Sequence, residues 1–273
     1  MSDFQMRARM HGFARRMHLT VTGSGASVVL GNGFGTELSI WDRVLPWLEA
    51  RFRVVRFDWP FAPGEFDAEH CRSLDGFADD LLAVVVAADA VPCLYVGHSV
   101  AGMAGVAAAG IRPDFFRQLV LLSASPRYLS EDGYVGGFSR DDVAGVLARM
   151  GEDFVRWAEN YSPLVVGLPG TRPEVEEFSR GLLAMRPDIA ICLMRTILES
   201  DMRLRLDGMT VPTTVVQPNH DHAVPMTVGA YLQAHLPAGR LEVIDAGGHL
   251  PHLTEPRQVV EVLERAIGSL ARR

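Results

Sequence analysis

The chain has 273 residues, of which 48% are hydrophobic, enough for one large α/β core and an inserted subdomain. The formal net charge of −7 and an isoelectric point near 5.7 argue against nucleic acid or an anionic membrane as a partner. Three widely spaced cysteines, Cys71, Cys93 and Cys192, form no C-x-x-C motif, which indicates a reducing compartment and a cytoplasmic location.

The first half of the chain has the pattern of an α/β protein. Residues 1–17 contain an Arg-Arg pair with no apolar run after it, so we expect a flexible leader and no export signal. No stretch reaches the ~20 apolar residues of a membrane span. From residue 18 to 125 apolar runs alternate with helical patterns, which predicts a mostly parallel sheet with helices on both faces. The expected strands are His18–Thr22, Ser27–Leu30, Phe52–Phe57, Cys93–Val96 and Leu119–Ser123, and the expected helices are Glu37–Ala50, Leu74–Ala88 and Val100–Gly110.

A glycine-rich turn at residues 31–36 opens from the end of the second expected strand. Backbone N–H groups in such a turn can point at the alkoxide that develops during acyl transfer. The second donor in this kind of site is the N–H of the residue after the nucleophilic serine, and the serine considered below is Ser99. The N–H groups of Phe34 and Val100 are therefore the candidate oxyanion hole. A phosphate cradle is disfavoured, because the three glycines do not match G-x-G-x-x-G and no P-loop lysine follows.

The expected strand Cys93–Val96 runs directly into Gly97-His98-Ser99-Val100-Ala101-Gly102 and then into a helix of small residues. This is the layout of a nucleophile elbow, in which a sharp strand-to-helix turn exposes a serine hydroxyl. A serine hydroxyl is a poor nucleophile unless a base takes its proton, so Ser99 requires a histidine and an acid further along. The motif departs from G-x-S-x-G at Ala101, which we interpret as a tolerated variant.

The strand–helix alternation resumes after residue 202, with apolar strands expected at 211–216 and 240–245. Asp221 lies in the loop beyond the first of them. His249 follows two glycines beyond the second, which allow a sharp turn at the sheet edge. Three strand-end positions in the order Ser99, Asp221, His249 predict a catalytic triad.

Other polar residues near these positions leave alternatives open. Asp245 competes with Asp221 as the acid, and His252 is a second candidate base. His98 is adjacent to the serine in the elbow and is expected to project away from its hydroxyl. The run from His220 to His222 is a weak metal candidate, because zinc needs three or four converging ligands. We therefore expect no metal and no cofactor.

The region between Ser125 and about Met202 shows no convincing strand, only amphipathic helical stretches. These are Arg140–Met150, Asp153–Asn160, Pro173–Met185 and Ile189–Glu199. An all-helical insertion between two halves of a sheet predicts a cap over the active site. The expected organisation is a hydrolase core in 1–127, a helical cap or lid in 128–202 and the second part of the core in 203–273.

Apolar and aromatic residues of the cap are candidates for a substrate pocket. A cap that covers a serine nucleophile with such side chains excludes water and holds a hydrophobic acyl or lactone group. The alternative is ordinary packing, because a small helical cap must bury its own apolar stripe. The pocket candidates are Phe138, Trp157, Tyr161 and Leu198.

Several motifs match one family of α/β-hydrolases, and some of them are specific to that family within the superfamily. They are Gly33-Phe34-Gly35-Thr36 with Trp41, Gly97-His98-Ser99-Val100, Ser123-Ala124-Ser125-Pro126-Arg127-Tyr128-Leu129, Gly136-Gly137-Phe138, Met185-Arg186-Pro187-Asp188-Ile189-Ala190, Ser200-Asp201-Met202-Arg203 and Gly248-His249-Leu250-Pro251-His252. On these motifs the chain resembles the family that includes the bacterial stress-response hydrolase RsbQ and the plant strigolactone and karrikin receptors. The resemblance implies an α/β-hydrolase fold with a V-shaped four-helix cap. It also implies the same triad and oxyanion donors, and a pocket that includes Phe34.

Two segments depart from that family's pattern. Asn32 stands where histidine or proline usually precedes the Gly-Phe-Gly turn. Residues 58–64 replace a small Gly-x-Gly turn with bulky residues, so that Trp59 and Phe61 either narrow the pocket or rest on the cap. Both departures bear on the substrate and leave the triad intact.

The combined pattern predicts a serine hydrolase that cleaves a small hydrophobic ester or lactone through an acyl-enzyme, without a cofactor. Two other classes stay open because a fold does not decide function. One is a small-molecule receptor with slow turnover and a protein partner at the cap. The other is a biosynthetic, non-hydrolytic enzyme in which Ser99 is dispensable.

Overall fold

The computed structural model describes residues 16–62, 64–237 and 239–267. Residues 1–15 of the expected leader lie outside this range. Met17 does not behave as part of a flexible leader, because it is fully buried and its carbonyl accepts a hydrogen bond from the Asp58 N–H (2.8 Å).

A seven-stranded sheet forms the centre of the fold, with strand order β1-β3-β2-β4-β5-β6-β7. Strand β1 is antiparallel to β3, and every other neighbouring pair is parallel. The central strand β4 is buried along its whole length, as expected for a parallel strand covered on both faces. The strands are β1 (Thr20–Gly23), β2 (Ser27–Gly31), β3 (Arg53–Arg56), β4 (Cys93–His98), β5 (Phe116–Leu122), β6 (Thr213–His220) and β7 (Gly239–Gly247).

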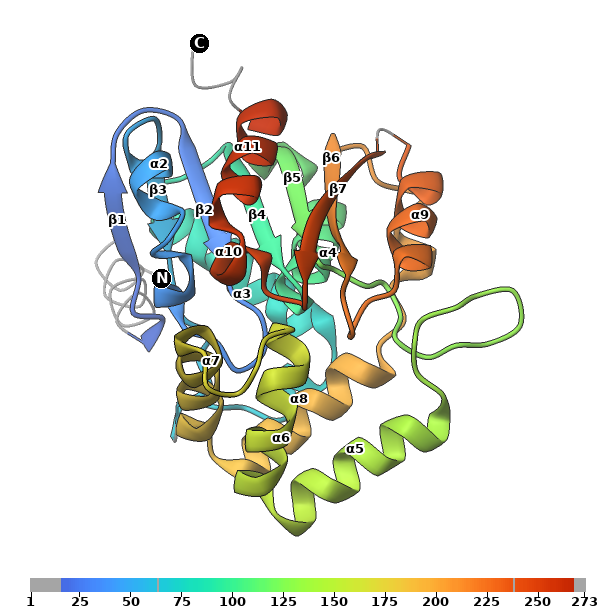
Figure 1. Ribbon diagram of the computed structural model, residues 1–273. Coiled ribbons are helices and arrows are strands. Elements are labelled where there is room, and N and C mark those ends of the chain that lie inside the picture. Colours follow the sequence, from blue (N-terminus) through green and yellow to red (C-terminus); the bar gives the residue numbers. More distant parts are fainter. Residues whose placement is uncertain (1–15, 63, 238, 268–273) are drawn as a thin grey trace.

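Helices cover both faces of the sheet, with α3 and α4 behind it and α11 in front in the view of Figure 1. The core helices are α2 (Leu45–Glu49), α3 (Leu74–Ala87), α4 (Val100–Ile111), α9 (Met226–His235), α10 (Pro251–Thr254) and α11 (Pro256–Ile267), with short 3-10 turns η1 (Leu38–Trp41), η2 (His70–Arg72), η3 (Pro113–Phe115) and η4 (Arg203–Arg205). The single helix expected over 37–50 is wrong, because the segment is divided into η1 and α2. Pro46 has no N–H and clashes with a preceding helical turn, so a helix can begin at this point but not continue through it.

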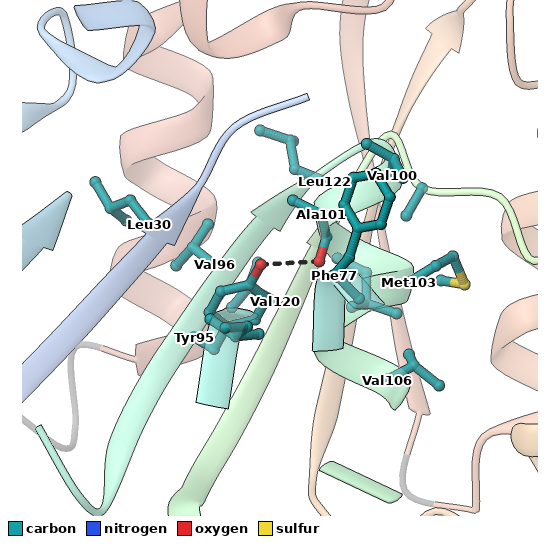
Figure 2. Packing of buried hydrophobic residues seen from close by; sticks show 14 of the residues in the cluster. Leu30, Phe77, Tyr95, Val96, Val100, Ala101, Met103, Val106, Val120 and Leu122 are labelled. Atoms are coloured by element: carbon teal, nitrogen blue, oxygen red, sulfur yellow. Dashed lines mark hydrogen bonds between the residues drawn. The ribbon is translucent and has the colours of Figure 1, made fainter. Parts of the chain in front are cut away.

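Helix α4 packs closely on the strand before it because its residues are small. Figure 2 shows the hydroxyl of Tyr95 in β4 donating a hydrogen bond to the Ala101 carbonyl in the first turn of the helix (2.8 Å). A Cβ at Gly105 would lie 2.4 Å from the Tyr95 ring, so only glycine fits there. Phe77 of α3 packs in the same buried cluster. These contacts fix the start of α4, which carries the elbow.

Four helices lie between β5 and β6 in sequence and form a layer beyond the carboxyl ends of the parallel strands (Figure 1). They are α5 (Arg140–Glu152), α6 (Phe154–Val166), α7 (Pro173–Ala184) and α8 (Pro187–Glu199), and all fall inside the segment predicted as the cap. Their starts follow capping rules: Ser139 and Asp142 form a capping box at α5, and α7 and α8 begin at a proline. Within the described ranges, no helix is long and apolar enough to cross a membrane.

Candidate active site

The turn between β4 and α4 holds Ser99 in a strained conformation, with φ 56° and ψ −124°. A Cβ at Gly97 would lie 2.7 Å from backbone atoms of Ala101 and Gly102, and a Cβ at Gly102 would lie 2.7 Å from the Cβ of Ala124. Glycine is therefore required at 97 and 102. The side chain of Ala101 is buried without such a requirement, which explains why alanine is accepted at the last position of the motif.

The three candidate triad residues form one chain of hydrogen bonds. The Ser99 Oγ lies 2.8 Å from the His249 Nε2, and the His249 Nδ1 lies 2.8 Å from the Asp221 Oδ2. The Asp221 side chain is fully buried, and its Oδ1 accepts the N–H groups of Ala223 (2.8 Å) and Val224 (3.0 Å). Both carboxylate oxygens are thus occupied, so the carboxylate has one orientation toward the imidazole.

The other candidates for the acid and the base lie outside this chain of hydrogen bonds. Asp245 is exposed and accepts a hydrogen bond from Asn219 (2.8 Å). His252 is buried between the rings of Trp41 and His98, with centroids 4.5 Å away on each side. The His98 Nε2 lies 2.9 Å from the His249 carbonyl oxygen, so this ring contacts the backbone of the candidate base. Among the described residues, no group of three or more His, Cys, Asp or Glu side chains is placed to hold a metal ion.

The glycine-rich loop after β2 passes directly over the serine. A Cβ at Gly33 would lie 3.2 Å from the Ser99 Cβ, which places the next residue, Phe34, at the candidate site. Val100 is the first residue of α4, so its N–H is one of the unsatisfied donors at a helix N-terminus. Within the described part of the chain, the N–H groups of Phe34 and Val100 have no hydrogen-bond acceptor. The structure thus brings two free donors to the side of Ser99.

The two departures from the family pattern contact each other. The Trp59 indole N–H donates to the Asn32 carbonyl (2.8 Å), and the Trp59 ring packs on Phe57, Phe61 and Phe77. Neither Trp59 nor Phe61 lines the cavity at the serine. Trp59 therefore supports the loop that carries Phe34 and does not narrow the pocket.

A small, mostly apolar cavity opens at Ser99 and His249. The expected residues Phe34, Phe138, Tyr161 and Leu198 line it. Trp157 does not line it, which corrects the expectation for that residue. The Trp157 ring instead stacks on the Tyr161 ring at 4.8 Å and 16°.

Tyr128 is a residue of the cavity that the sequence reasoning did not select. Its hydroxyl lies 3.4 Å from the Ser99 Oγ, and burial raises its pKa to about 12. Tyr128 and Tyr161 are the cavity's tyrosines, and they place two hydroxyls in mostly apolar surroundings. One feature of the sequence could have identified Tyr128: it lies six residues beyond the carboxyl end of β5, at the edge of the sheet where ligands bind in α/β folds.

Burial lowers the pKa of His252 to about 3, with a smaller effect from His249. Burial, followed by the neighbouring His252, also places the pKa of His98 well below its ordinary value. In the unfolded chain both residues titrate near 6.5, so the unfolded state takes up protons first as the pH falls. The stability that depends on the neutral rings is complete above about pH 6.5 and is lost as the pH falls toward 3. For His252 the loss is up to about 1.4 kcal/mol per pH unit in that window, and His98 acts in the same direction.

His252→Phe should therefore make the free energy of unfolding less dependent on pH, by about 1.4 kcal/mol per unit between pH 6.5 and 5. The apolar ring loses no hydrogen bond, because neither nitrogen of His252 has a partner. Urea unfolding at several pH values measures this slope. His222→Gln, at an exposed position, is the control and should leave the slope unchanged. An unchanged slope in His252→Phe would contradict the explanation.

The serine–histidine–aspartate chain at strand ends, beneath a helical cap, defines the class of α/β hydrolases. The family model of the alpha/beta hydrolase fold matches residues 26–256. The chain is 42% identical over 264 residues to karrikin insensitive 2 receptor IA of Petunia hybrida, covering 94% of this chain and 96% of that one. It is 38% identical over 263 residues to strigolactone esterase D14 of Arabidopsis thaliana, covering 94% and 98%. A solved hydrolase from Oleispira antarctica superposes with a TM-score of 0.90 at 29% identity, covering 95% and 97%.

The chain belongs to the α/β-hydrolase family, within which it is similar to karrikin and strigolactone proteins. The expected fold class is confirmed by the sheet and by the family match. The resemblance inferred from the motifs is confirmed as well, because it extends over the cap and both parts of the core.

Proposed function

We propose that this protein hydrolyses small hydrophobic esters or lactones through an acyl-enzyme on Ser99. The observation that carries the proposal is the continuous hydrogen-bonded chain Ser99–His249–Asp221 at the base of an apolar cavity. His249 takes the proton of Ser99 as its Oγ attacks the carbonyl carbon, and the N–H groups of Phe34 and Val100 stabilise the oxyanion. His249 then protonates the leaving group, and water activated by the same imidazole releases the acid.

The cavity supports a short acyl group as the preferred substrate. It is small and lined mainly by aromatic and aliphatic side chains, which leave little room for a long acyl chain. We expect kcat/KM for p-nitrophenyl butyrate to exceed that for the dodecanoate by roughly tenfold or more, and a simple butenolide to be opened. A flat chain-length profile would contradict the pocket assignment, and no turnover of any ester or lactone would contradict the proposed function.

A second candidate is a small-molecule receptor that turns over slowly. This candidate is favoured because the similar Petunia hybrida protein is named a receptor. A partner protein would then bind the cap in the conformation that the ligand stabilises. A burst of one product equivalent per protein followed by a negligible steady rate would indicate the receptor. Linear multiple turnover would indicate the metabolic enzyme. In both cases we propose a cytoplasmic protein, since all three cysteines are unpaired, and no nucleic-acid or membrane partner, given the net charge of −7.

A further inference from the structure

Two cap helices contact the two loops that carry the candidate catalytic groups. At both contacts, glycines allow the backbones to approach closely. We infer that α6 and α7 together form a brace that positions His249 and the Phe34 N–H, with Gly181 as a positioning residue. This inference rests on the proposed function for its kinetic consequences. The contacts themselves are independent of the substrate.

The first contact joins the end of α6 to the histidine loop. The His249 N–H donates to the Val165 carbonyl in the last turn of α6 (2.7 Å). The chains can approach this closely because Gly167 and Gly248 lack side chains: a Cβ at Gly248 would lie 2.1 Å from the Val166 carbonyl oxygen, and one at Gly167 would lie 2.5 Å from the Gly248 nitrogen. The backbone of the candidate base is therefore bonded to the cap.

The second contact joins α7 to the loop of the candidate oxyanion hole. A Cβ at Gly181 would lie 2.7 Å from the Gly35 carbonyl oxygen, so the helix rests on the peptide next to Phe34. Gly35 has φ +72°, and a Cβ there would lie 2.9 Å from a methyl of Leu182. A bidentate ion pair between Arg43 and Glu177 (3.1 and 2.9 Å) connects the same helix to the core.

The two helices also pack on each other next to the cavity. The Tyr161 ring of α6 lies 6.3 Å from the Phe178 ring of α7, measured between centroids, and both residues line the cavity. Displacement of one helix is thus transmitted to the other. Oxyanion donors act over about 2.7–3.1 Å, so a shift of several tenths of an ångström reduces their effect.

Gly181→Ala tests the brace, with Gly151→Ala as the matched control. Both substitutions add one methyl to a cap helix, but Gly151 has no atom within 4 Å of the added Cβ. For Gly181→Ala we expect kcat for p-nitrophenyl butyrate to fall roughly tenfold, with KM changed by less than about twofold. If the variant only contained less folded protein, the apparent kcat would also fall. Amide exchange would then not change specifically in the two contacted loops.

Hydrogen–deuterium exchange supplies that local measurement and does not depend on turnover. In Gly181→Ala, amides in both 31–36 and 246–250 should exchange faster than in wild type, while Gly151→Ala leaves both segments unchanged. Faster exchange in 31–36 alone, or equal behaviour of the two variants, would overturn the joint brace. If wild type cleaves no ester, the proposed function fails and the exchange result still decides the brace.

Glu177→Gln is a second variant, which changes the charge of the side chain but not its size. It removes the charge that pairs with Arg43, and the brace predicts faster exchange in the same two segments, by about twofold. Unchanged exchange in Glu177→Gln together with unchanged exchange in Gly181→Ala would overturn the inference.

Discussion

Ser99→Ala should lower kcat for a p-nitrophenyl ester by roughly 10⁵–10⁶-fold, the scale seen when the nucleophile of a serine triad is removed. The substitution deletes the only atom that attacks the carbonyl, and it leaves the oxyanion donors and the cavity in place. The measurement is the initial rate of ester hydrolysis, with circular dichroism as a check on folding. Retained activity would contradict the acyl-enzyme and favour a non-hydrolytic, biosynthetic role.

Ser123→Ala is the control for that experiment. Ser123 is buried, its hydroxyl has no hydrogen-bond partner, and its φ of +52° is close to the +56° of Ser99. The same backbone strain therefore accompanies both substitutions. Ser123→Ala should leave kcat and KM unchanged, so a loss of activity in Ser99→Ala alone reports the missing nucleophile.

Asp221→Asn should lower kcat by about 10⁴-fold, because an amide that donates to the His249 Nδ1 fixes the imidazole in the wrong tautomer. The Nε2 then carries a proton and cannot accept the proton of Ser99. The oxygen of the new side chain can still accept the N–H groups of Ala223 and Val224, as the Asp221 Oδ1 does now. We therefore expect the loop to keep its structure, and KM to change little. Steady-state kinetics at neutral pH measures both quantities.

Asp245→Asn separates the two acids that the sequence left in competition. Asp245 is exposed and bonded to Asn219, so its substitution should change kcat by less than about twofold. Equal losses in Asp221→Asn and Asp245→Asn would mean that the hydrogen bond between Asp221 and His249 does not orient the base.

Much of the candidate site follows from the sequence because its parts lie at strand ends. Ser99, Asp221 and His249 each come directly after an apolar run with a turn, and carboxyl ends of parallel strands meet at one edge of a sheet. The break in the expected helix over 37–50 was also visible in the sequence, as Pro46.

Contacts between distant segments could not be predicted in this way. Trp157 and Tyr161 are four residues apart and share a helix face, yet only Tyr161 lines the cavity, because the Trp157 ring stacks on its ring. Likewise, Asn32 and Trp59 each look like an isolated departure until the structure places the indole N–H on the Asn32 carbonyl. Neither spacing nor composition encodes the direction of such side chains.

Detection of the covalent intermediate is the most direct test of the proposal that an acyl-enzyme forms on Ser99. Wild-type protein is mixed with excess p-nitrophenyl acetate, quenched in acid within the first turnovers and digested, and the peptide that contains Ser99 is examined by tandem mass spectrometry. We predict one acetyl group on the Ser99 Oγ and none in Ser99→Ala. An acetyl group on another residue that turns over at the rate of catalysis, or hydrolysis at the wild-type rate by Ser99→Ala, would contradict this proposal.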